Sequence, residues 1–428
     1  MAEPQAPLKP SPARGWSAYQ WGIVLLLLFG LVLSAIDKVN LAVTGPYWIK
    51  HHLFTAPQVG LLQAILGWSL TFFLLIAGPL VDRYHPRVVL PIGMLLTSLG
   101  TWVTGMVTSL GVLQVVRGVV GMGQAALFPS APRLIVENIE DQDRSKAISI
   151  YFAGNKVGPT VGIPLASFFL LALGWRGVFY ATGALGAVWL ILWFAIYRRN
   201  KAPIAAPVEA SAKEQHVSWG HLFAYRTTWA LIFGQFGYLY VLYVFLTWLP
   251  GYLVLQQHLG TALSGALGSL PFIISIVTTL FGGWLADFWI VKSRGNKTLV
   301  RKTIVGGGLF LSTVFIIIAA FSHAVLPAMI FLSLTMAAMG MVTGSVNALP
   351  MDLAPRAIVS SLSSLQNFGG NLGGAFAPLI TGLLLAKTHS FQVPLIVTGL
   401  VALVFGVGSY VLLMGEVRPT YTVPASNS

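Results

Sequence analysis

The sequence predicts an all-α membrane protein with twelve transmembrane helices in two pseudo-symmetric six-helix bundles. Of the 428 residues, 56% are hydrophobic and 9% are charged, whereas soluble domains carry about 25% charged residues. Apolar segments long enough to span a bilayer, about 20 residues each, recur twelve times, and one long polar stretch divides them into six and six. The chain contains no cysteine, which excludes disulfides and thiolate metal sites.

The twelve apolar segments follow one another with short polar turns between most of them. The N-terminal bundle is expected over 17–197, with spans at about 17–46, 57–80, 87–107, 110–135, 145–171 and 175–197. The C-terminal bundle is expected over 226–414, with spans at about 226–255, 263–290, 301–322, 325–352, 357–386 and 390–414. A linker rich in Pro, Ala and charge joins them at 198–225, and polar tails are expected at 1–16 and 415–428.

Positive charge is distributed unevenly between the two ends of these spans. Nineteen of the 25 lysines and arginines fall on the side of both termini and the linker, three on the other side, and three within spans. Cytoplasmic loops of membrane proteins carry the excess of Lys and Arg. We therefore expect a multi-pass protein of the bacterial inner membrane with both termini and the linker in the cytoplasm. The net charge of +13 is then a topology signal, and no nucleic acid partner is expected.

The first span contains ionisable residues, which are costly inside a bilayer. It reads GIVLLLLFGLVLSAIDKVNLAVTGP over 22–46, with Asp37 and Lys38 inside an otherwise apolar helix. An ionisable group at that depth costs at least ~2.5–3.5 kcal/mol and normally faces a cavity or a partner. Either these residues line a transport pathway, which the continuing helix pattern favours, or they snorkel from the end of the helix.

Charged residues within the spans are few and unequal in sign. Among the twelve acids only Asp37 lies within a span, where Lys38, Arg117 and Lys156 accompany it. The N-terminal bundle thus holds a formal charge of +2, and unpaired buried charge is unfavourable. An organic anion would compensate this charge, so the spans themselves predict an anion transporter.

Each intramembrane cation is a candidate substrate contact. Arg117 offers a planar fork that fits a carboxylate in bidentate fashion; otherwise it snorkels near the start of its span. Gln124 lies two turns further on the same helix face and can hydrogen-bond a hydroxyl or carbonyl group. Lys156 is either a second anion contact or the resting partner of Asp37. Lys38 points about 100° away from Asp37 around the helix.

The C-terminal bundle supplies neutral polar residues. Candidate substrate contacts are Tyr243, Asn347, Asn367 and Asn371, and the last two share a helix face at i, i+4. Tyrosines often anchor helices at the membrane interface, and the asparagines could instead hydrogen-bond between helices. Neutral donors opposite a charged bundle suit a substrate with a carboxylate head and a hydroxylated or aromatic body.

A short motif recurs at the same point of the two bundles and supports their pseudo-symmetry. Gly78 and Asp82, followed by Arg83, come after the second span, and Gly283 and Asp287 repeat the Gly-x-x-x-Asp spacing after the eighth. Glycine permits close helix approach, and an aspartate at a helix end can meet a helix N-terminus or an arginine. We expect a latch between the bundles that opens and closes during transport. Simple loop packing is the alternative.

Five sequence motifs carry a family resemblance. They are GPLVDRYHPR at 78–87, RGVVGMGQAALFP at 117–129, TWLPGY at 247–252, DLAP at 352–355 and NFGGNLGG at 367–374. The first resembles the signature loop of the major facilitator superfamily, with His85-Pro86 where that family usually has glycine. The others look like its anion:cation symporter branch, which includes sugar-acid, hexuronate and phthalate permeases. The resemblance covers residues 17–414 and implies the fold of that superfamily.

The resemblance also implies roles for individual residues. In the bacterial sugar-acid members, Asp37 corresponds to a proton-coupling aspartate, Arg117 to an anion-binding arginine and Asn155 to an amide that contacts the substrate. The chain departs from the family pattern at Gln124, where a glutamate is usual, and at Leu70, where a tyrosine is common.

Together these features predict proton-coupled uptake of an organic carboxylate by alternating access. Because Gln124 cannot titrate, one proton per substrate is expected, which favours a monocarboxylate such as a sugar acid. An anion exchanger or facilitator without proton coupling is the first alternative. A transporter-like carboxylate sensor is the second, although the 28-residue linker is short for a signalling domain. No catalytic, metal-ligand or cofactor motif stands out, so we expect a monomeric transporter that is not an enzyme and needs no cofactor.

Overall fold

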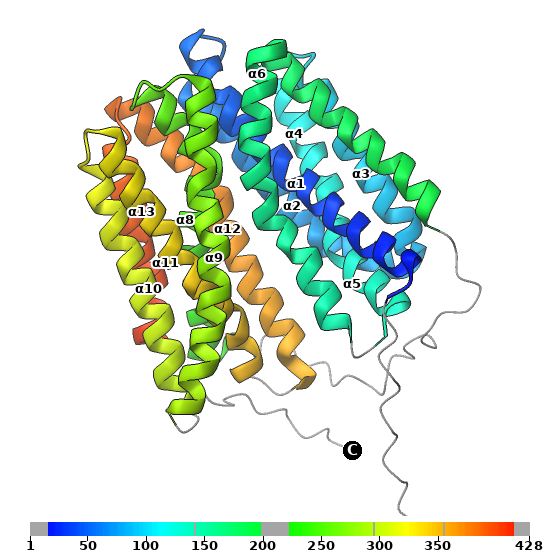
Figure 1. Cartoon of the computed structure of the whole chain (residues 1–428), viewed down its shortest axis with the longest axis vertical. Helices are drawn as coiled ribbons and strands as arrows, with labels where there is room; N and C mark the ends of the chain where they lie inside the picture. The colour runs from blue at the N-terminus through cyan, green and yellow to red at the C-terminus, as the bar shows by residue number, and fades with distance from the viewer. Residues whose placement is uncertain (1–15, 141–142, 198–221, 294–295, 354–355, 415–428) are drawn as a thin grey trace, which may run out of the picture.

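The computed structural model describes residues 16–140, 143–197, 222–293, 296–353 and 356–414. The expected tails and most of the expected linker lie outside these ranges. The described chain consists of long helices joined by short turns (Figure 1).

The helices follow the order of the apolar segments. The N-terminal group comprises α1 (Ala18–Lys50), α2 (Ala56–Tyr84), α3 (Pro86–Thr104), α4 (Leu110–Ala125), α5 (Leu127–Asn138) and α6 (Arg144–Ile196). The C-terminal group comprises α8 (Arg226–Leu255), α9 (Thr261–Lys292), α10 (Lys297–Ala320), α11 (Val325–Leu353), α12 (Arg356–Thr388), α13 (Gln392–Val401) and the π-helix η2 (Ala402–Leu413). Within the described residues, 11 helical segments are long and apolar enough to cross a membrane, with α4–α5 and α13–η2 counted as one segment each.

Helix α6 accounts for the twelfth crossing. It has 53 residues, or about 80 Å at 1.5 Å per residue, far more than the ~30 Å of a hydrocarbon core. Gly174 interrupts it with φ 71° and ψ 178°, a conformation that glycine adopts without a steric penalty. The chain turns back at this point (Figure 1), and the two arms of α6 are the expected spans 145–171 and 175–197. The predicted twelve-helix fold is confirmed.

Small residues allow the central helix pairs to approach closely. Helix α1 packs along the first arm of α6, where a Cβ atom added to Gly158 would overlap the side chain of Ala35. Helix α8 packs along α12 in the same way, and a Cβ atom at Gly373 would overlap the backbone of Phe236. Such small-residue contacts are how transmembrane helices gain van der Waals packing. They fix α1 and α8, the first helix of each group, against one partner helix.

The two groups meet along α1–α8, α2–α12 and α6–α9. A Cβ atom at Gly60 of α2 would overlap the carbonyl oxygen of Pro378 in α12, and one at Gly265 of α9 would lie 2.5 Å from Ser167 in α6. These contacts lie toward the distal end, defined as the end where α1 and α8 finish. Toward the terminal end, where α1 and α8 begin, Gly78 of α2 has no heavy atom within 4 Å of its Cβ position. Figure 1 shows the groups diverging there.

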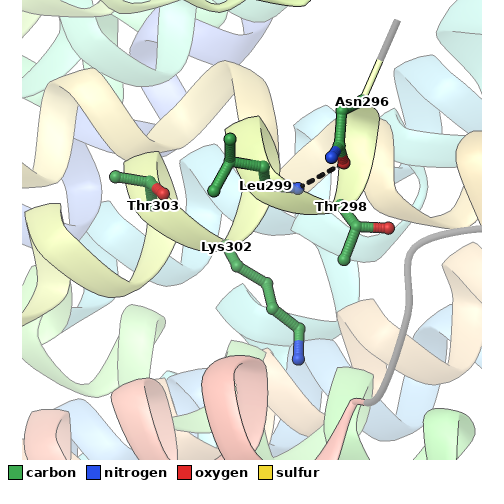
Figure 2. Close-up of a pocket in the computed structure, with 5 residues that line it drawn as sticks. All are labelled: Asn296, Thr298, Leu299, Lys302 and Thr303. Carbon is green, nitrogen blue, oxygen red and sulfur yellow. Dashed lines mark hydrogen bonds between the residues drawn. The ribbon is translucent and has the colours of Figure 1, made fainter. Parts of the chain in front are cut away.

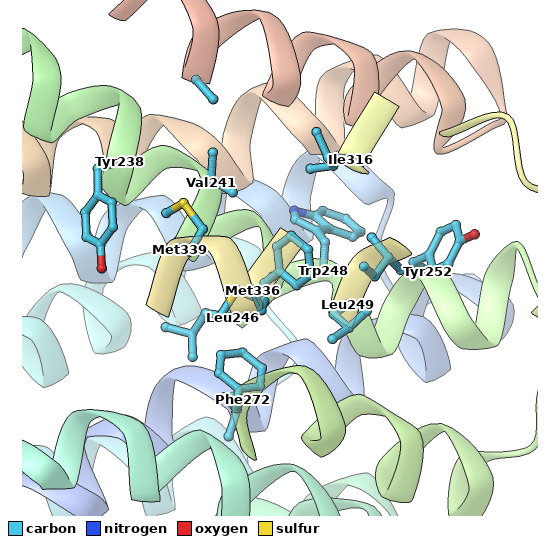
Figure 3. Close-up of a cluster of buried hydrophobic side chains, with 14 of the residues drawn as sticks. Tyr238, Val241, Leu246, Trp248, Leu249, Tyr252, Phe272, Ile316, Met336 and Met339 are labelled. Atoms are coloured by element: carbon cyan, nitrogen blue, oxygen red, sulfur yellow. The ribbon is translucent and has the colours of Figure 1, made fainter. Parts of the chain in front are cut away.

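An apolar core closes the distal end. Trp48 of α1 is fully buried against Phe54, Trp175 and Phe179, and it belongs to the same hydrophobic cluster as Trp248 of α8. Figure 3 shows the part of this cluster in the C-terminal group, which includes Tyr238, Val241, Leu246, Leu249, Tyr252, Phe272, Ile316, Met336 and Met339. The packed distal end therefore joins the two groups.

Candidate functional site

Asp37 lies in a buried polar network that joins α1, α3 and α6. Its side chain is 5% exposed. The Thr101 hydroxyl of α3 donates to Oδ1 of Asp37 at 2.8 Å. Asn40, one turn further along α1, donates to the same oxygen at 3.4 Å and to Oγ1 of Thr182 in α6 at 2.9 Å. This network holds the Asp37 carboxyl group inside the N-terminal group.

Arg117 of α4 lies beside Asp37 but is only partly satisfied. Its side chain is 1% exposed, and Nη2 donates to the backbone oxygen of Asp37 at 3.5 Å. The Nε and Nη1 atoms have no hydrogen-bond partner in the described part of the chain. Burying a charged donor without a partner is costly. The geometry therefore presents a guanidinium able to bind a further oxyanion.

Gln124 lies in the same region, on the same helix as Arg117. It is fully buried on α4, with its amide beside Asp37. Neither Nε2 nor Oε1 makes a hydrogen bond of good geometry to any described residue. The predicted residues Asp37, Arg117 and Gln124 are thus brought together, and all three are enclosed within the N-terminal group.

The two predicted lysines lie instead at the boundary between the groups. Lys156 of α6 donates from Nζ to Oγ of Ser275 in α9 at 2.9 Å. Lys38 of α1 lies over the Tyr243 ring of α8, with Nζ 6.0 Å from the ring centroid. Tyr243 packs directly on Gly374 of α12. Both lysines therefore face neutral partners from the opposite group, and Lys156 does not pair with Asp37.

The four predicted asparagines are more exposed than this central set. Asn155, Asn347 and Asn367 are exposed, and Asn371 is partly buried. Asn367 donates to Ser363 O at 2.9 Å, and Asn371 donates to Asn367 O at 3.0 Å. These two amide N–H groups are used within α12, and no hydrogen bond in the described chain links the four asparagines to Asp37 or Arg117.

The predicted latch residues of the N-terminal group lie in a charge cluster. Asp82 pairs with Nη1 of Arg133 at 3.2 Å, and Glu137 pairs with Arg133 at 3.1 Å and with Nε2 of His85 at 3.1 Å. Arg83 lies over the Tyr84 ring. These contacts stay within the N-terminal group, so a latch between groups remains a prediction.

The corresponding residues of the C-terminal group are less engaged. Asp287 is exposed, and the Cβ position of Gly283 has no heavy atom within 4 Å. The ion pairs near this end join Asp352 of α11 to Lys297 and Arg301 of α10, at 2.7 and 2.9 Å.

Sequence reasoning missed the uncharged members of the site, namely Thr101, Asn40, Thr182 and Ser275. A weak signal existed in α3, where Thr97, Thr101 and Thr104 recur at helical spacing and are all buried. Ser275 carried no such signal, because single hydroxyls are common along these helices.

A surface pocket at the start of α10 lies apart from these residues. Figure 2 shows its lining, which comprises Asn296, Thr298, Leu299, Lys302 and Thr303. Asn296 caps the helix by accepting from the backbone N–H of Leu299 at 3.0 Å, and Lys302 donates to Val411 O at 2.9 Å. These polar groups are engaged in local structure, so the pocket is not part of the candidate site.

The chain is similar to known transporters over most of its length. A family model for the Major Facilitator Superfamily matches residues 27–378 and 297–428. The probable L-galactonate transporter of Escherichia coli (strain K12) is 29% identical over 405 residues, covering 92% of this chain and 89% of that protein. The probable sulfoacetate transporter of Cupriavidus necator is 27% identical over 416 residues, covering 94% of each.

The helix arrangement also matches a solved structure. A bacterial homologue of the human lysosomal transporter Spinster, in an inward-facing and occupied conformation, has a TM-score of 0.80 over 93% of this chain and 97% of that one, at 16% identity. At that identity the likeness shows the fold alone. The family match covers most of the chain and confirms the resemblance seen in the motifs. The chain belongs to the Major Facilitator Superfamily, and it is therefore a membrane transporter rather than an enzyme.

Proposed function

We propose that the protein takes up an organic carboxylate together with a proton. The observation that carries this proposal is the pairing of one buried acid, Asp37, with a buried Arg117 whose Nε and Nη1 have no partner in the described chain. A guanidinium with free donors is suited to a carboxylate. Relatives named for galactonate and sulfoacetate support an organic anion as the substrate.

Asp37 and Arg117 can couple proton to anion through charge balance. When Asp37 is ionised, it neutralises part of the charge on Arg117. When Asp37 takes up a proton, Arg117 loses that counter-charge and attracts a carboxylate more strongly. By linkage, each ligand raises the affinity for the other by the same factor. Proton uptake then favours substrate binding, and substrate release favours proton release.

The expected stoichiometry is one proton per substrate. Asp37 is the one acid expected within a span, and Gln124 does not titrate. For a monocarboxylate, one proton makes transport electroneutral. A dianion would carry one net negative charge inward, opposed by ~2.3 kcal/mol per 100 mV. A sugar acid with one carboxylate is therefore the favoured substrate.

Alternating access would arise from rocking of two bundles, 17–197 and 226–414, around a site between them. The closed distal end would open as the terminal end closes.

We propose that the substrate contacts Lys38, Arg117, Gln124, Asn155, Lys156, Tyr243, Asn347, Asn367 and Asn371. The latch at the terminal end would consist of Gly78, Asp82, Arg83, Gly283 and Asp287.

The charge distribution indicates how the protein is oriented in the membrane. From the sequence, nineteen of the 25 lysines and arginines are expected on the side of the termini, which favours a cytoplasmic terminal end. The proposed location is the bacterial inner membrane, where the protein would act as a monomer. A reporter fused within 198–225 should be cytoplasmic and one in the 50–56 loop external; both reporters on one side would contradict this topology.

An anion exchanger is the second candidate, and Gln124 is the residue that favours it. A neutral amide beside Asp37 leaves a single group to carry protons. If Asp37 kept its charge throughout the cycle, the protein would exchange one anion for another.

Reconstituted vesicles distinguish these candidates. The purified protein is tested with D-galactonate, D-gluconate, D-glucuronate and sulfoacetate, and with neutral D-galactose as control, while the pH gradient and the voltage are set independently. We expect a monocarboxylate to accumulate only with acid outside, regardless of voltage, and D-galactose not to accumulate. Uptake that needs a trans anion and ignores the pH gradient would identify an exchanger. Binding of no carboxylate would overturn the proposal.

A further inference from the structure

Lys156 and Ser275 form a hydrogen bond between the two groups near the middle of their spans. Lys156 follows the start of α6 by twelve residues, and Ser275 follows the start of α9 by fourteen. Their side-chain atoms are 2.9 Å apart. The lysine is partly buried, and no acid of the described chain forms an ion pair with it. A desolvated ammonium with only a neutral partner favours the approach of an anion.

Both residues are held on closely packed helices. On α6, Gly154 and Gly158 flank Lys156, and Cβ atoms at these positions would meet Leu31 and Ala35 of α1. On the other side, a Cβ atom at Gly340 of α11 would lie 2.6 Å from the backbone oxygen of Ser275. Neither backbone can shift without disturbing a helix interface, so the two side chains are held in position before an anion arrives.

The Ser275 hydroxyl group differs in its bonding from its neighbours on α9. Ser269 donates to Ala266 O at 2.8 Å, and Thr279 donates to Ser275 O at 2.7 Å, both within the helix. Oγ of Ser275 instead accepts from Lys156 across the boundary. A hydroxyl group that accepts one hydrogen bond still has its own hydrogen to donate. A carboxylate oxygen beside Lys156 could therefore receive a hydrogen bond from both side chains, each strengthened by charge.

We propose that Lys156 and Ser275 form a subsite for one carboxylate oxygen of the substrate, with Ser275 as a specificity-determining contact from the C-terminal group. This inference rests on the proposed function, because it takes an organic carboxylate as the substrate. It adds that the anion binds α6 and α9 at once. Substrate binding then ties the two moving groups together at the level of the site.

The test is isothermal titration of the purified full chain with the carboxylate of the panel above that binds most tightly. A lost hydrogen bond to a charged group corresponds to roughly a ten- to hundredfold weaker affinity. Ser275→Ala should raise Kd by about tenfold, Lys156→Gln by more, and Ser275→Thr, which keeps the hydroxyl, by less than threefold. Ser269→Ala is the matched control on the same helix and should leave Kd unchanged.

A double variant separates a shared subsite from a structural bridge. If Ser275 acts on the anion that Lys156 holds, Ser275→Ala should weaken binding less in the Lys156→Gln background than alone. A bridge that only supports packing would instead lower the thermal stability of Ser275→Ala and leave Kd unchanged.

Kd of Ser275→Ala within twofold of the unmodified protein would overturn the inference. So would an equal loss of affinity in Ser269→Ala. If the unmodified protein binds no carboxylate of the panel, the proposed function itself fails, and the two failures are thereby distinguished.

Discussion

The two groups of helices bury polar side chains in different ways. The N-terminal group encloses a carboxylate and a guanidinium, Asp37 and Arg117, and leaves two guanidinium nitrogens unpaired in the described chain. The C-terminal group encloses a neutral network, in which Tyr410 donates to Oε1 of Gln235 at 3.1 Å and accepts from Nε2 of Gln366 at 3.4 Å. Its buried Arg301 is paired with Asp352 at 2.9 Å. The first arrangement holds charge in need of a partner, and the second is internally paired.

Because of this difference, substitutions in the two groups should affect different properties of the protein. A satisfied polar network rigidifies the helices that it joins, whereas an unsatisfied buried group in a native structure calls for an explanation such as a ligand. Changes to the charged residues of the N-terminal group should therefore act on transport and binding. Changes to the neutral network of the C-terminal group should act on stability.

The largest effect is expected from Asp37→Asn. The amide keeps the size of the carboxyl group but cannot carry a proton, so accumulation driven by a pH gradient should be abolished. Substrate binding should remain measurable by titration. Asp37→Glu, which keeps the carboxyl group, should retain part of the gradient-driven uptake. Accumulation by Asp37→Asn against a substrate gradient, with acid outside, would show that Asp37 does not carry the proton.

Arg117→Lys should have the next largest effect, on affinity. Lysine keeps the charge but loses the bidentate fork, and a lost hydrogen bond to a charged group corresponds to ~1.5–3 kcal/mol. Arg176→Lys provides the control, because Arg176 lies over the Trp175 ring at the distal end and should not affect substrate affinity. An unchanged Kd in Arg117→Lys would remove Arg117 from the proposed binding site.

Much of the fold could be predicted because each membrane crossing must satisfy its own backbone hydrogen bonds and face lipid. That requirement forces long apolar segments, which the sequence displays directly. Even the reversal inside α6 was visible, since the sequence predicts separate spans at 145–171 and 175–197. The charged members of the site were visible for the same reason: an ionisable residue in an apolar span is conspicuous.

The sequence could not predict which of these residues are enclosed within the N-terminal group and which lie at the boundary between the groups. Arg117 is enclosed behind α1, whereas Lys156 faces α9, and this depends on how each helix is rotated against its neighbours. The hydroxyl partners were hidden for another reason. Buried hydroxyl groups usually bond to their own helix, as Thr104 does with Gly100 O at 2.8 Å. In the sequence, Thr101 and Ser275 resemble such hydroxyl-bearing residues. They differ from them only because a partner on another helix lies opposite.

Tyr410→Phe tests the neutral network of the C-terminal group. The change removes a buried hydroxyl and leaves Gln235 and Gln366 without that partner, at a cost of about 1–3 kcal/mol. Thermal unfolding should therefore begin at a lower temperature, while Kd for the carboxylate stays unchanged. Tyr84→Phe, at a half-exposed position, is the control and should change neither quantity. A weaker Kd in Tyr410→Phe would show that the neutral network also serves binding.

The smallest effect is expected on the pH dependence of stability, from the charge cluster that contains His85 at the terminal end. His85 joins α2 to α3 with φ 66°. Its Nδ1 accepts from the backbone N–H of Arg87 at 3.2 Å, and its Nε2 lies 3.1 Å from Glu137. An accepting Nδ1 requires a neutral ring with its proton on Nε2. Burial lowers the pKa of His85 below its usual value; Glu137 opposes this shift, and the charge of Arg133 adds to it.

The sign of the pH effect follows from this shift. Below about pH 6.5, the ordinary value for histidine, the unfolded chain binds a proton that the folded His85 takes up only at lower pH. Stability therefore rises with pH in this range and falls as the pH drops from 7 toward 5. His85→Asn, which tolerates positive φ, should flatten this dependence. The measurement is the difference in thermal unfolding temperature between pH 7 and pH 5.

The C-terminal group supplies the contrast for this prediction. Its cluster consists of Asp352 with Lys297 and Arg301 and contains no histidine, so the pH effect at the terminal end should arise from the N-terminal cluster. His389→Asn is the matched control: His389 also has positive φ, 51°, but lies at the distal end after α12. It should preserve the slope seen in the unmodified protein. An equal flattening by both substitutions would mean that His85 is not its source.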